Sequence, residues 1–422
     1  MKHVVLIIDG ASGWPATALG GRTSLEAART PHLDRLAREG TVGVSRNVPE
    51  GMEASSAVAC MSVMGFDPSL YYAGRGPIEA MAMGIHLEPG QVAMRCNLVT
   101  VEDGRMVSYS AGNITSDESA ELVAALREGL GIAFSDESAG GRLGLHAGVG
   151  FRHILTVRDG VDLLATEFVP PHNITDQEVA GHDPTGPGAE LVRDLMERSK
   201  PILAAHPVNK ARVARGLPPA TQIWLFWPGM EPARMPTFHD SYGERRAALT
   251  SAVDLLRGLA RQTGIDCLDI PGVTDGGDND FAGQMAGAVE ALADYDVVFV
   301  HVEAPDEMSH AGDAEGKVRA IEQVDALMVP QVTALNEAAA RRDAPAARPG
   351  EAEGVRLLVM PDHPTPLEIK THVHDPVPFV LWGPGFGANG AEAFTETEAR
   401  ATGFAVAPGH LLMSLFLDGS TG

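Results

Sequence analysis

The sequence predicts an α/β fold, with a doubly wound, mostly parallel sheet and a smaller inserted α/β domain. Short apolar, β-branched runs bounded by turn signals alternate with longer segments of helical pattern. The clearest strand predictions are "HVVLIID", "DVVFVHVEAPD" and "VRLLVMPDHP". Near-continuous apolar runs of this kind are typical of parallel strands that helices cover on both faces of the sheet.

Helical segments lie between these strands. "TPHLDRLAREG" has a proline near its start and a glycine at its end, which are ordinary helix start and stop signals. Two longer helical patterns are "ERRAALTSAVDLLRGLARQTG" and "GKVRAIEQVDALMVPQVTALNEAAARR". This order of elements favours the doubly wound α/β class.

One part of the chain differs in pattern from the rest. Residues 112–185 contain glycine-rich turns and the short strand-like segment "FRHILTV", with apolar residues throughout. We therefore expect a core formed by 1–111 and 186–422, with a compact domain inserted over 112–185. Residues 341–354 are rich in alanine, proline and charge, and we expect a surface loop or a helix end there.

Composition limits the class of partner. The formal net charge is -24, which argues against binding to nucleic acid or to an anionic membrane, because like charges repel. An anionic ligand must then be bound locally, by a few arginines or a metal ion. The amino-terminal "MKHVVLIIDG" has an apolar run too short for a signal peptide or a membrane span, so we expect a buried strand and a cytoplasmic location.

The chain has three widely separated cysteines. Cys60, Cys96 and Cys267 offer no disulfide framework and no zinc-knuckle spacing. We expect buried free thiols in a reducing compartment.

An acidic residue follows the last apolar position of each of three predicted strands. These residues are Asp9, Asp306 and Asp362. Ligands of open α/β sheets bind beyond the carboxyl ends of the strands, so we expect the three carboxylates to converge.

Histidines accompany two of these carboxylates. His310 lies four residues after Asp306, His363 directly follows Asp362, and "KTHVHDP" supplies either His372 or His374. Carboxylate and imidazole ligands without thiolate favour Mn²⁺, Zn²⁺ or a similar ion over an iron–sulfur cluster or Cu(I). A single tetrahedral ion cannot use all of these ligands, whereas a pair of ions can, and such pairs clamp phosphoryl groups during in-line displacement.

Two adjacent serines open the segment "EASSAVACMSVMG". Either Ser55 or Ser56 could be a nucleophile that a metal ion activates, at a helix start where an anion is favoured. Either could instead be an ordinary helix N-cap. The residues alone leave both alternatives open.

Basic residues are fewer than acidic ones, 32 against 56, so arginines set among glycines stand out as candidates for anion binding. The guanidinium fork matches carboxylate and phosphate geometry, although surface ion pairs are the alternative. The candidates for substrate binding are Arg75, Arg95, Arg152 and Arg245.

Long stretches of the chain resemble one known family. They include "LGGRTSLEAARTPHLDRLAREG", "GFDPSLYYAGRGPIEAMAMGI", "RCNLVTVEDGRMVSYSAGNI", "LPPATQIWLFWPG", "HVEAPDEMSHAGD" and "PDHPTPLEIKTHVHDPVPF". In these stretches the chain resembles the archaeal-type, cofactor-independent phosphoglycerate mutases and their bacterial relatives, within the alkaline phosphatase superfamily. The resemblance implies a core of alkaline-phosphatase type, with an inserted domain that covers the substrate.

The resemblance also implies two divalent ions, Mn²⁺ or Zn²⁺ with Mg²⁺ or Co²⁺ as alternatives, and no 2,3-bisphosphoglycerate. One ion would be held by Asp306, His310 and His372, and the other by Asp9, Ser56, Asp362 and His363. Ser56 would be the nucleophile. It would take the phosphoryl group of 3-phosphoglycerate as a phosphoserine and return it to the 2-hydroxyl of glycerate, which is a glycolytic isomerase reaction on a small phosphorylated metabolite.

The chain departs from the family pattern close to this nucleophile. Relatives carry an acidic residue at the position of Ala57 and a histidine or asparagine at Cys60, and usually histidine and aspartate at Asn113 and Asn173. The metal ligands are complete while the polar residues that face the substrate have changed. Alternatives are therefore a homoserine kinase-like phosphotransferase, a phosphomonoesterase, or a catalytically lapsed metal-binding protein, each a monomer or a small homo-oligomer.

Overall fold

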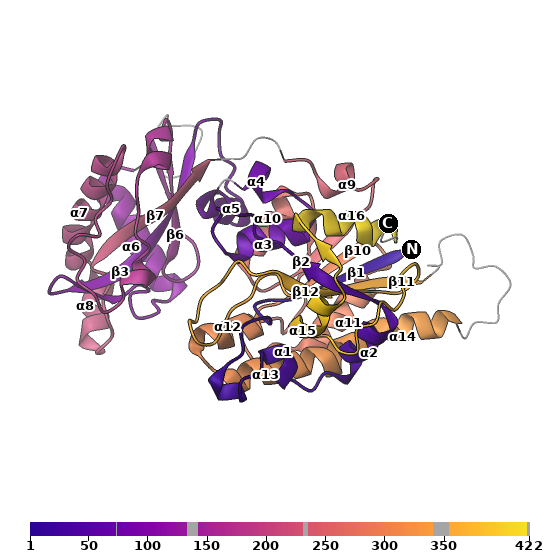
Figure 1. The fold of residues 1–422 in the computed structure, drawn as a ribbon. Coiled ribbons are helices and arrows are strands. Elements are labelled where there is room, and N and C mark those ends of the chain that lie inside the picture. Colours follow the sequence, from indigo (N-terminus) through magenta and orange to yellow (C-terminus); the bar gives the residue numbers. More distant parts are fainter. Residues whose placement is uncertain (73, 133–141, 231–234, 341–353, 420–422) are drawn as a thin grey trace. The chain divides into compact units, whose positions relative to one another are not determined.

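An eight-stranded sheet lies at the centre of the larger of two units into which the chain divides (Figure 1). The computed structural model describes residues 1–72, 74–132, 142–230, 235–340 and 354–419. The first unit comprises Met1–Tyr72 and Met235–Gly422, and the second comprises Ala73–Arg234.

The sheet of the first unit is mostly parallel. Its order is β13 (Ala405–Val406), β2 (Thr41–Ser45), β12 (Val377–Trp382), β11 (Val355–Met360), β1 (Lys2–Ile8), β10 (Val297–Val302), β8 (Ala247–Thr250) and β9 (Asp266–Cys267). Strand β1 is parallel to both β10 and β11, whereas β12 is antiparallel to both of its neighbours. The predicted fold class is confirmed.

Helices cover both faces of this sheet. Figure 1 shows α3 (Ser56–Val63), α10 (Asp254–Gln262) and α16 (Leu412–Asp418) on one face. The opposite face carries α1 (Ser24–Ala27), α2 (Pro31–Glu39), α11 (Phe281–Ala291), α13 (Ala314–Gln323), α14 (Val329–Ala340) and α15 (Glu396–Ala401). Shorter elements of this unit are α4 (Pro68–Tyr71), α9 (Phe238–Ser241), α12 (Ala304–Ala311), the 3₁₀ turns Thr17–Leu19 and Gly409–Leu411, and a π-helical turn at Val324–Met328.

The core follows from the alternation of side chains along the central strand. Val4, Leu6 and Ile8 of β1 are fully buried and belong to the same apolar cluster as Leu33 of α2 and Met285 of α11. The intervening residues of β1 are also fully buried, on the other face of the sheet. Burial on both faces explains why β1 is apolar without interruption from Val4 to Ile8.

The second unit is built on an antiparallel sheet. Its strands run in the order β4 (Arg105–Ser108), β3 (Val92–Glu102), β6 (Arg152–Val157) and β5 (Leu143–His146), and β7 (Gln222–Met230) pairs with the other edge of β3. Its helices are α5 (Arg75–Ala82), α6 (Ser116–Leu130), α7 (Ala189–Ala205) and α8 (Pro207–Ala214), with 3₁₀ turns at Val161–Ala165 and Pro171–Ile174.

The predicted inserted domain covers only the middle of this unit. Strands β3 and β7 lie outside residues 112–185, yet they pair with each other along most of their length and contribute to one apolar cluster with α6 and α7. The unit therefore begins and ends well outside the predicted boundaries. The predicted loop at 341–354 lies, apart from Gly354, outside the described residues.

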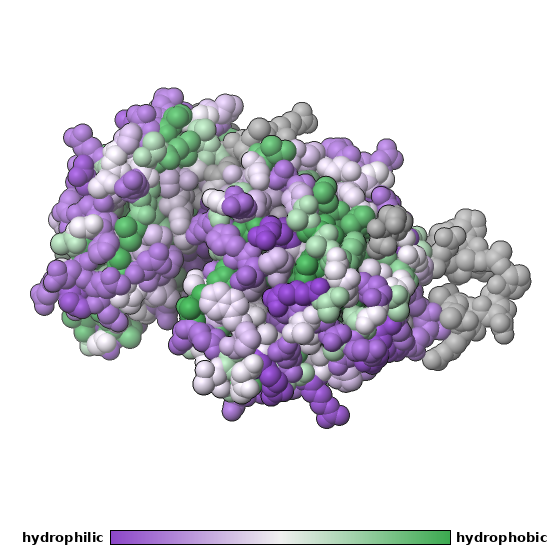
Figure 2. All heavy atoms as spheres, in the orientation of Figure 1, coloured by the Kyte–Doolittle hydropathy of each residue, from purple (hydrophilic) through white to green (hydrophobic). Residues whose placement is uncertain are grey.

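The face drawn in Figure 2 is mixed, with hydrophilic residues over much of it and groups of hydrophobic residues between them. Within the described residues, no helix combines the length and the apolar character needed to cross a bilayer.

Truncation of the central strand should cost stability. Leu6 is fully buried, so Leu6→Ala should lower the free energy of unfolding by about 3 kcal/mol through lost burial and the cavity left behind. Leu70 is 67% exposed, so Leu70→Ala is the matched control and should change it by less than about 0.5 kcal/mol. Urea denaturation of both variants measures the difference, and equal losses would contradict the described core.

Candidate active site

Three adjacent parallel strands bring the predicted carboxylates together. Asp9 follows β1, Asp362 follows the neighbouring β11, and Asp306 lies in the first turn of α12 directly after β10. All three carboxylates are buried. His363 Nε2 lies 3.2 Å from Asp362 Oδ2 and 3.6 Å from Asp9 Oδ1. The carboxyl edge of the sheet is therefore where the chain gathers its acidic side chains, as expected.

The first predicted ligand set is compact. His310 Nε2 lies 3.0 Å from Asp306 Oδ2, with which it shares one face of α12, and His372 Nε2 lies 3.5 Å from the same oxygen. The Nδ1 atoms of His310 and His372 face the carbonyl oxygens of Lys370 and Ala54 at 2.9 and 3.2 Å. A carbonyl only accepts hydrogen bonds, so both Nδ1 atoms donate, and the two Nε2 atoms are left as ligands.

These electron-rich atoms need a cation between them. The two Nε2 atoms are 3.0 Å apart, and both face one carboxylate oxygen. Hydrogen bonding to Asp306 raises the pKa of His310 to about 9, so a proton occupies this position when no metal is bound. Burial alone would raise the pKa of Asp306, but its hydrogen bonds with His310 and His372 hold that pKa well below its usual range. The set fits a divalent metal ion.

Of the two candidate histidines, the geometry favours His372 as the ligand. His374 Nε2 lies 2.7 Å from the carbonyl oxygen of Met52 and belongs to no described cluster of metal-ligating atoms. His372, in contrast, joins Asp306 and His310.

The two serines occupy different roles in the structure. Ser55 is the N-cap of α3, and its Oγ accepts a hydrogen bond from the backbone N–H of Val58 at 3.5 Å. Ser56 is the first residue of the helix, and its Oγ lies 3.1 Å from His363 Nε2. Ser55 has an extended backbone, with φ −151°, as is usual for an N-cap residue. The cap and the candidate nucleophile are therefore neighbours rather than alternatives.

Backbone groups orient the second predicted ligand set. Asp362 Oδ1 accepts hydrogen bonds from the backbone N–H of Gly10 at 3.2 Å and of His363 at 2.8 Å, which leaves Oδ2 directed at the histidine. Gly10 has φ +61°, and a Cβ atom there would lie 2.4 Å from Asp306 Oδ1. Only glycine therefore lets the backbone directly after β1 pass this close to Asp306 of the first ligand set.

The charge of the site is unbalanced without cations. Burial, reinforced by Asp362 and Asp306, raises the pKa of Asp9 well above its usual range. Burial and the charge of Asp9 do the same to the pKa of Glu303. The two carboxyl groups share a hydrogen bond, which requires a proton between them, and among the described residues no other donor reaches Asp9 Oδ1 or Glu303 Oε2. The ion pairs recorded for these two residues involve only histidines. Divalent cations suit this arrangement.

The sequence reasoning missed several residues of the site. His301 of β10 places Nε2 2.7 Å from Asp9 Oδ2, and the hydroxyl of Thr365 donates to Asp306 Oδ1 at 2.6 Å. The buried Lys317 ammonium donates to the carbonyl oxygens of Ser12 at 3.2 Å and Thr365 at 2.9 Å, and so ties the loops after β1 and β11 together. One signal was present in the sequence: a histidine interrupts the apolar run of β10.

The second unit brings three of the predicted arginines together. Arg75 Nε donates to Glu79 Oε1 at 2.9 Å, Arg95 pairs with the other oxygen of Glu79, and Arg95 Nε donates to Asn97 Oδ1 at 2.9 Å. Arg152 lies opposite Asn97 in the sheet. Burial lowers the pKa of Arg95, and the charges of Arg75 and Arg152 add to that effect. We call Arg75, Arg95 and Arg152 the arginine cluster.

Aromatic side chains flank this arginine cluster. Arg75 lies over Trp227 at 4.4 Å, and Arg152 lies over Phe151 at 4.5 Å. Within the described part of the chain, no ion pair is recorded for Arg152. The cluster is thus a local positive site in an acidic protein.

The structure does not bring Arg245 to the predicted metal ligands of its own unit. It precedes β8, and its charge acts on Asp296, which precedes β10. It therefore lies at the amino edge of the parallel strands, whereas the predicted metal ligands lie at the carboxyl edge of the same sheet. The candidate role of Arg245 in substrate binding is corrected on this ground.

The four residues at which the chain departs from the family pattern lie in different parts of the structure. Ala57 and Cys60 are buried in α3, and Cys60 Sγ lies 3.5 Å from Asp362 Oδ2. Asn113 and Asn173 lie in the second unit, and Asn113 has a left-handed backbone, with φ 51°, which asparagine tolerates.

The fold and the site together define a metal-dependent phosphotransferase. A family model described as 2,3-bisphosphoglycerate-independent phosphoglycerate mutase matches residues 37–209. The enzyme of that name from Methanothrix thermoacetophila is 45% identical over 420 residues, covering 99% of this chain and 100% of the relative. A probable 2,3-bisphosphoglycerate-independent phosphoglycerate mutase from Geobacter sulfurreducens is 41% identical over 423 residues, covering 99% and 100%.

Solved structures agree with these relatives. A protein from Pyrococcus horikoshii matches with a TM-score of 0.78 and 26% identity, covering 99% of this chain and 97% of that one. The cofactor-independent phosphoglycerate mutase from Thermoplasma acidophilum matches with a TM-score of 0.63 and 25% identity, covering 99% of both chains. The chain belongs to the 2,3-bisphosphoglycerate-independent phosphoglycerate mutase family.

Metal removal should make stability depend on pH. The pKa of His310 is about 9 in the folded chain, against 6.5 ordinarily, so the stability it contributes is complete below pH 6.5 and is lost as the pH rises through about 9. A bound cation replaces that proton, so Mn²⁺ should raise the melting temperature most at the upper end of this range. Thermal unfolding in EDTA and in Mn²⁺ measures both effects.

His310→Gln should flatten this pH dependence and reduce the Mn²⁺ effect. His239→Gln is the control, because the His239 side chain is 52% exposed, and it should behave like the parent chain. A parent protein whose melting temperature is the same in EDTA and in Mn²⁺ would contradict the assignment of this set to a metal ion.

Proposed function

We propose that this chain interconverts 3-phosphoglycerate and 2-phosphoglycerate through a phosphoserine at Ser56, with two divalent cations bound at the carboxyl edge of the first unit's sheet. The observation that carries the proposal is the position of Ser56 at the start of α3, with Oγ 3.1 Å from His363 Nε2. Membership of the mutase family supports the choice of substrate.

The two ligand sets would each hold one cation. Asp306, His310 and His372 would hold one, and Asp9, Ser56, Asp362 and His363 would hold the other. Bound cations supply positive charge that lowers the pKa of a hydroxyl and offsets the negative charge of a phosphoryl group. Mn²⁺ or Zn²⁺ is the proposed identity, with Mg²⁺ or Co²⁺ as alternatives.

Besides the cations, two features of the protein itself support the attack by Ser56. Burial lowers the pKa of His363 to about 4, which favours a neutral ring. Because the Thr365 hydroxyl donates to Asp306, His363 Nδ1–H donates to Thr365 and Nε2 accepts from the Ser56 hydroxyl in the metal-free chain. The amino end of α3 directs its partial positive charge toward an anion at Ser56. The nucleophile therefore lies where a phosphoryl group is favoured.

The arginine cluster of the second unit would bind the anionic groups of phosphoglycerate. Each guanidinium offers a fork of donors that matches a carboxylate or a phosphate. That the second unit covers the substrate and excludes water stays a prediction, as do the cytoplasmic location and the monomeric or small homo-oligomeric state.

A second candidate is phosphoryl transfer with another small metabolite, as in a homoserine kinase-like enzyme or a phosphomonoesterase. The buried Ala57 and Cys60 favour it, because neither offers the polar group that relatives carry beside the nucleophile. An enolase-coupled assay of 3-phosphoglycerate, set against homoserine phosphorylation and phosphate release, separates the three activities. Inactivity in the first assay together with activity in another would contradict the mutase proposal.

Removing the nucleophile should abolish turnover. Ser56→Ala should lower kcat by roughly 10³-fold or more, because no other group accepts the phosphoryl group. Ser55→Ala is the matched control. It removes only a helix cap and should retain activity with a small loss of stability, about 1 kcal/mol.

Mass spectrometry after incubation with substrate and Mn²⁺ should find phosphate on Ser56. Unchanged activity of Ser56→Ala would refute the covalent mechanism, and inactivity of the parent chain would favour a lapsed metal-binding protein.

The arginine cluster should control substrate binding. Arg152→Ala should lower kcat/KM for 3-phosphoglycerate by roughly 10- to 100-fold, the usual effect of losing a charged hydrogen bond to a bound anion. Arg245→Ala, at the amino edge of the first unit's sheet, should leave kcat/KM within about twofold of the parent value. Steady-state kinetics on both variants tests this difference. A larger loss of kcat/KM in Arg245→Ala than in Arg152→Ala would contradict the role of the arginine cluster in substrate binding.

A further inference from the structure

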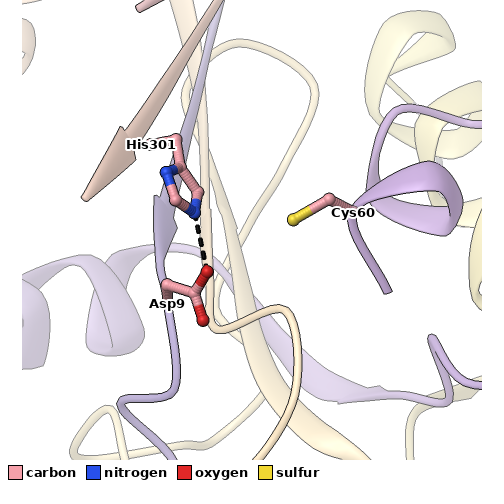
Figure 3. Close-up of side chains that lie close together, drawn as sticks. All are labelled: Asp9, Cys60 and His301. Atoms are coloured by element: carbon pink, nitrogen blue, oxygen red, sulfur yellow. Dashed lines mark hydrogen bonds and ion pairs between the residues drawn. The ribbon is translucent and has the colours of Figure 1, made fainter. Parts of the chain in front are cut away.

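Three side chains of different chemistry meet beside the predicted ligand sets. One ligand atom each from Asp9, Cys60 and His301 lies within 4.8 Å of the other two, and all three residues are buried. Figure 3 shows the Cys60 thiol extending from α3 toward Asp9 of the β1 end and His301 of β10. Asp9 also belongs to the second ligand set described above, and the Cys60 thiol lies 3.5 Å from Asp362 Oδ2 of that set, but Cys60 and His301 are members of neither set.

The histidine in this group is oriented as a ligand. His301 Nδ1 lies 3.0 Å from Ser251 Oγ, and Nε2 lies 2.7 Å from Asp9 Oδ2. In the metal-free chain Nε2–H donates to this carboxylate oxygen and Nδ1 accepts from the serine hydroxyl. A bound cation would take the place of the Nε2 proton, and Nδ1–H would then donate to Ser251, as is usual for the far nitrogen of a metal-binding histidine.

Two further buried atoms point to a missing positive charge. The carboxyl groups of Asp9 and Glu303 are buried and hydrogen-bonded to each other, which requires a proton between them; within the described residues no other donor reaches Asp9 Oδ1 or Glu303 Oε2, and Glu303 Oε2 lies 3.5 Å from His301 Nε2. Two buried carboxyl groups that depend on one shared proton are costly, and a cation would replace that proton. This observation is independent of the cysteine.

We propose that Cys60, Asp9 and His301, with Glu303 at their edge, form a third cation site that selects a thiophilic divalent ion such as Zn²⁺. A donor set of one sulfur, one imidazole nitrogen and carboxylate oxygen matches Zn²⁺ or Co²⁺ and disfavours Mg²⁺ and Mn²⁺. Tetrahedral zinc places such donors about 3–4 Å apart, so a small contraction of the group suffices. Binding forms a metal–sulfur bond, breaks the S–H bond and releases the proton to solvent.

The site would fix the helix that carries the nucleophile. Cys60 lies four residues after Ser56 in α3, so the two side chains share one face of that helix. A cation held by Cys60 and by two strand residues would tie α3 to β1 and β10. Histidine or asparagine at this position, as in relatives of the resembled family, would not supply a thiolate.

Cobalt titration of the metal-free full-length protein tests the proposal without measuring activity, so its result is independent of the mutase assignment. We expect three Co²⁺ ions per chain by elemental analysis, and a sulfur-to-cobalt charge-transfer band in the near ultraviolet. Cys60→Ser should bind two ions and lose that band, while the visible bands of the remaining cobalt persist. Cys96→Ser is the matched control, because Cys96 is also buried but lies in the second unit, and it should keep the band and the third ion.

The parent chain alone can overturn the proposal. Absence of the near-ultraviolet band at saturating Co²⁺ would refute the cysteine-containing site, whether or not the variants fold. Survival of the band in Cys60→Ser would refute the role of this cysteine.

Discussion

Buried negative charge at one edge of a sheet is the constraint on which the rest of this structure depends. Asp9, Asp306 and Asp362 are almost fully buried beside one another, and Glu303 lies among them. Buried, ionised carboxylates are unfavourable unless cations offset their charge or protons neutralise it. The surrounding residues fit this requirement. Histidines direct their ligand nitrogens at the carboxylates, Gly10 lets the backbone after β1 approach Asp306 closely, and the buried Lys317 joins the loops after β1 and β11.

The sequence predicted the sheet edge but not the complete site. Acidic residues at strand ends and the four-residue spacing of Asp306 and His310 are local patterns, so the sequence displays them. His301 could not be assigned in the same way, because its role depends on the register that places β10 beside β1. The position of Arg245 at the opposite edge follows from strand direction, which a local motif does not reveal.

The boundaries of the second unit were missed for a similar reason. Strands β3 and β7 are separated by more than a hundred residues, and antiparallel pairing between them leaves no mark on composition. The arginine cluster was found as separate residues, whereas its convergence arises from β3 and β6 pairing next to α5. Two of its arginines share Glu79, which shows how an acidic chain with net charge -24 keeps a positive site locally.

The central claim is that the two predicted ligand sets hold divalent cations around Ser56. Anomalous diffraction from crystals grown with Mn²⁺ tests it most directly. The account predicts one anomalous peak among Asp306, His310 and His372, and a second among Asp9, Ser56, Asp362 and His363. Crystals with Mn²⁺ in the solution but no anomalous peak at either set would contradict it.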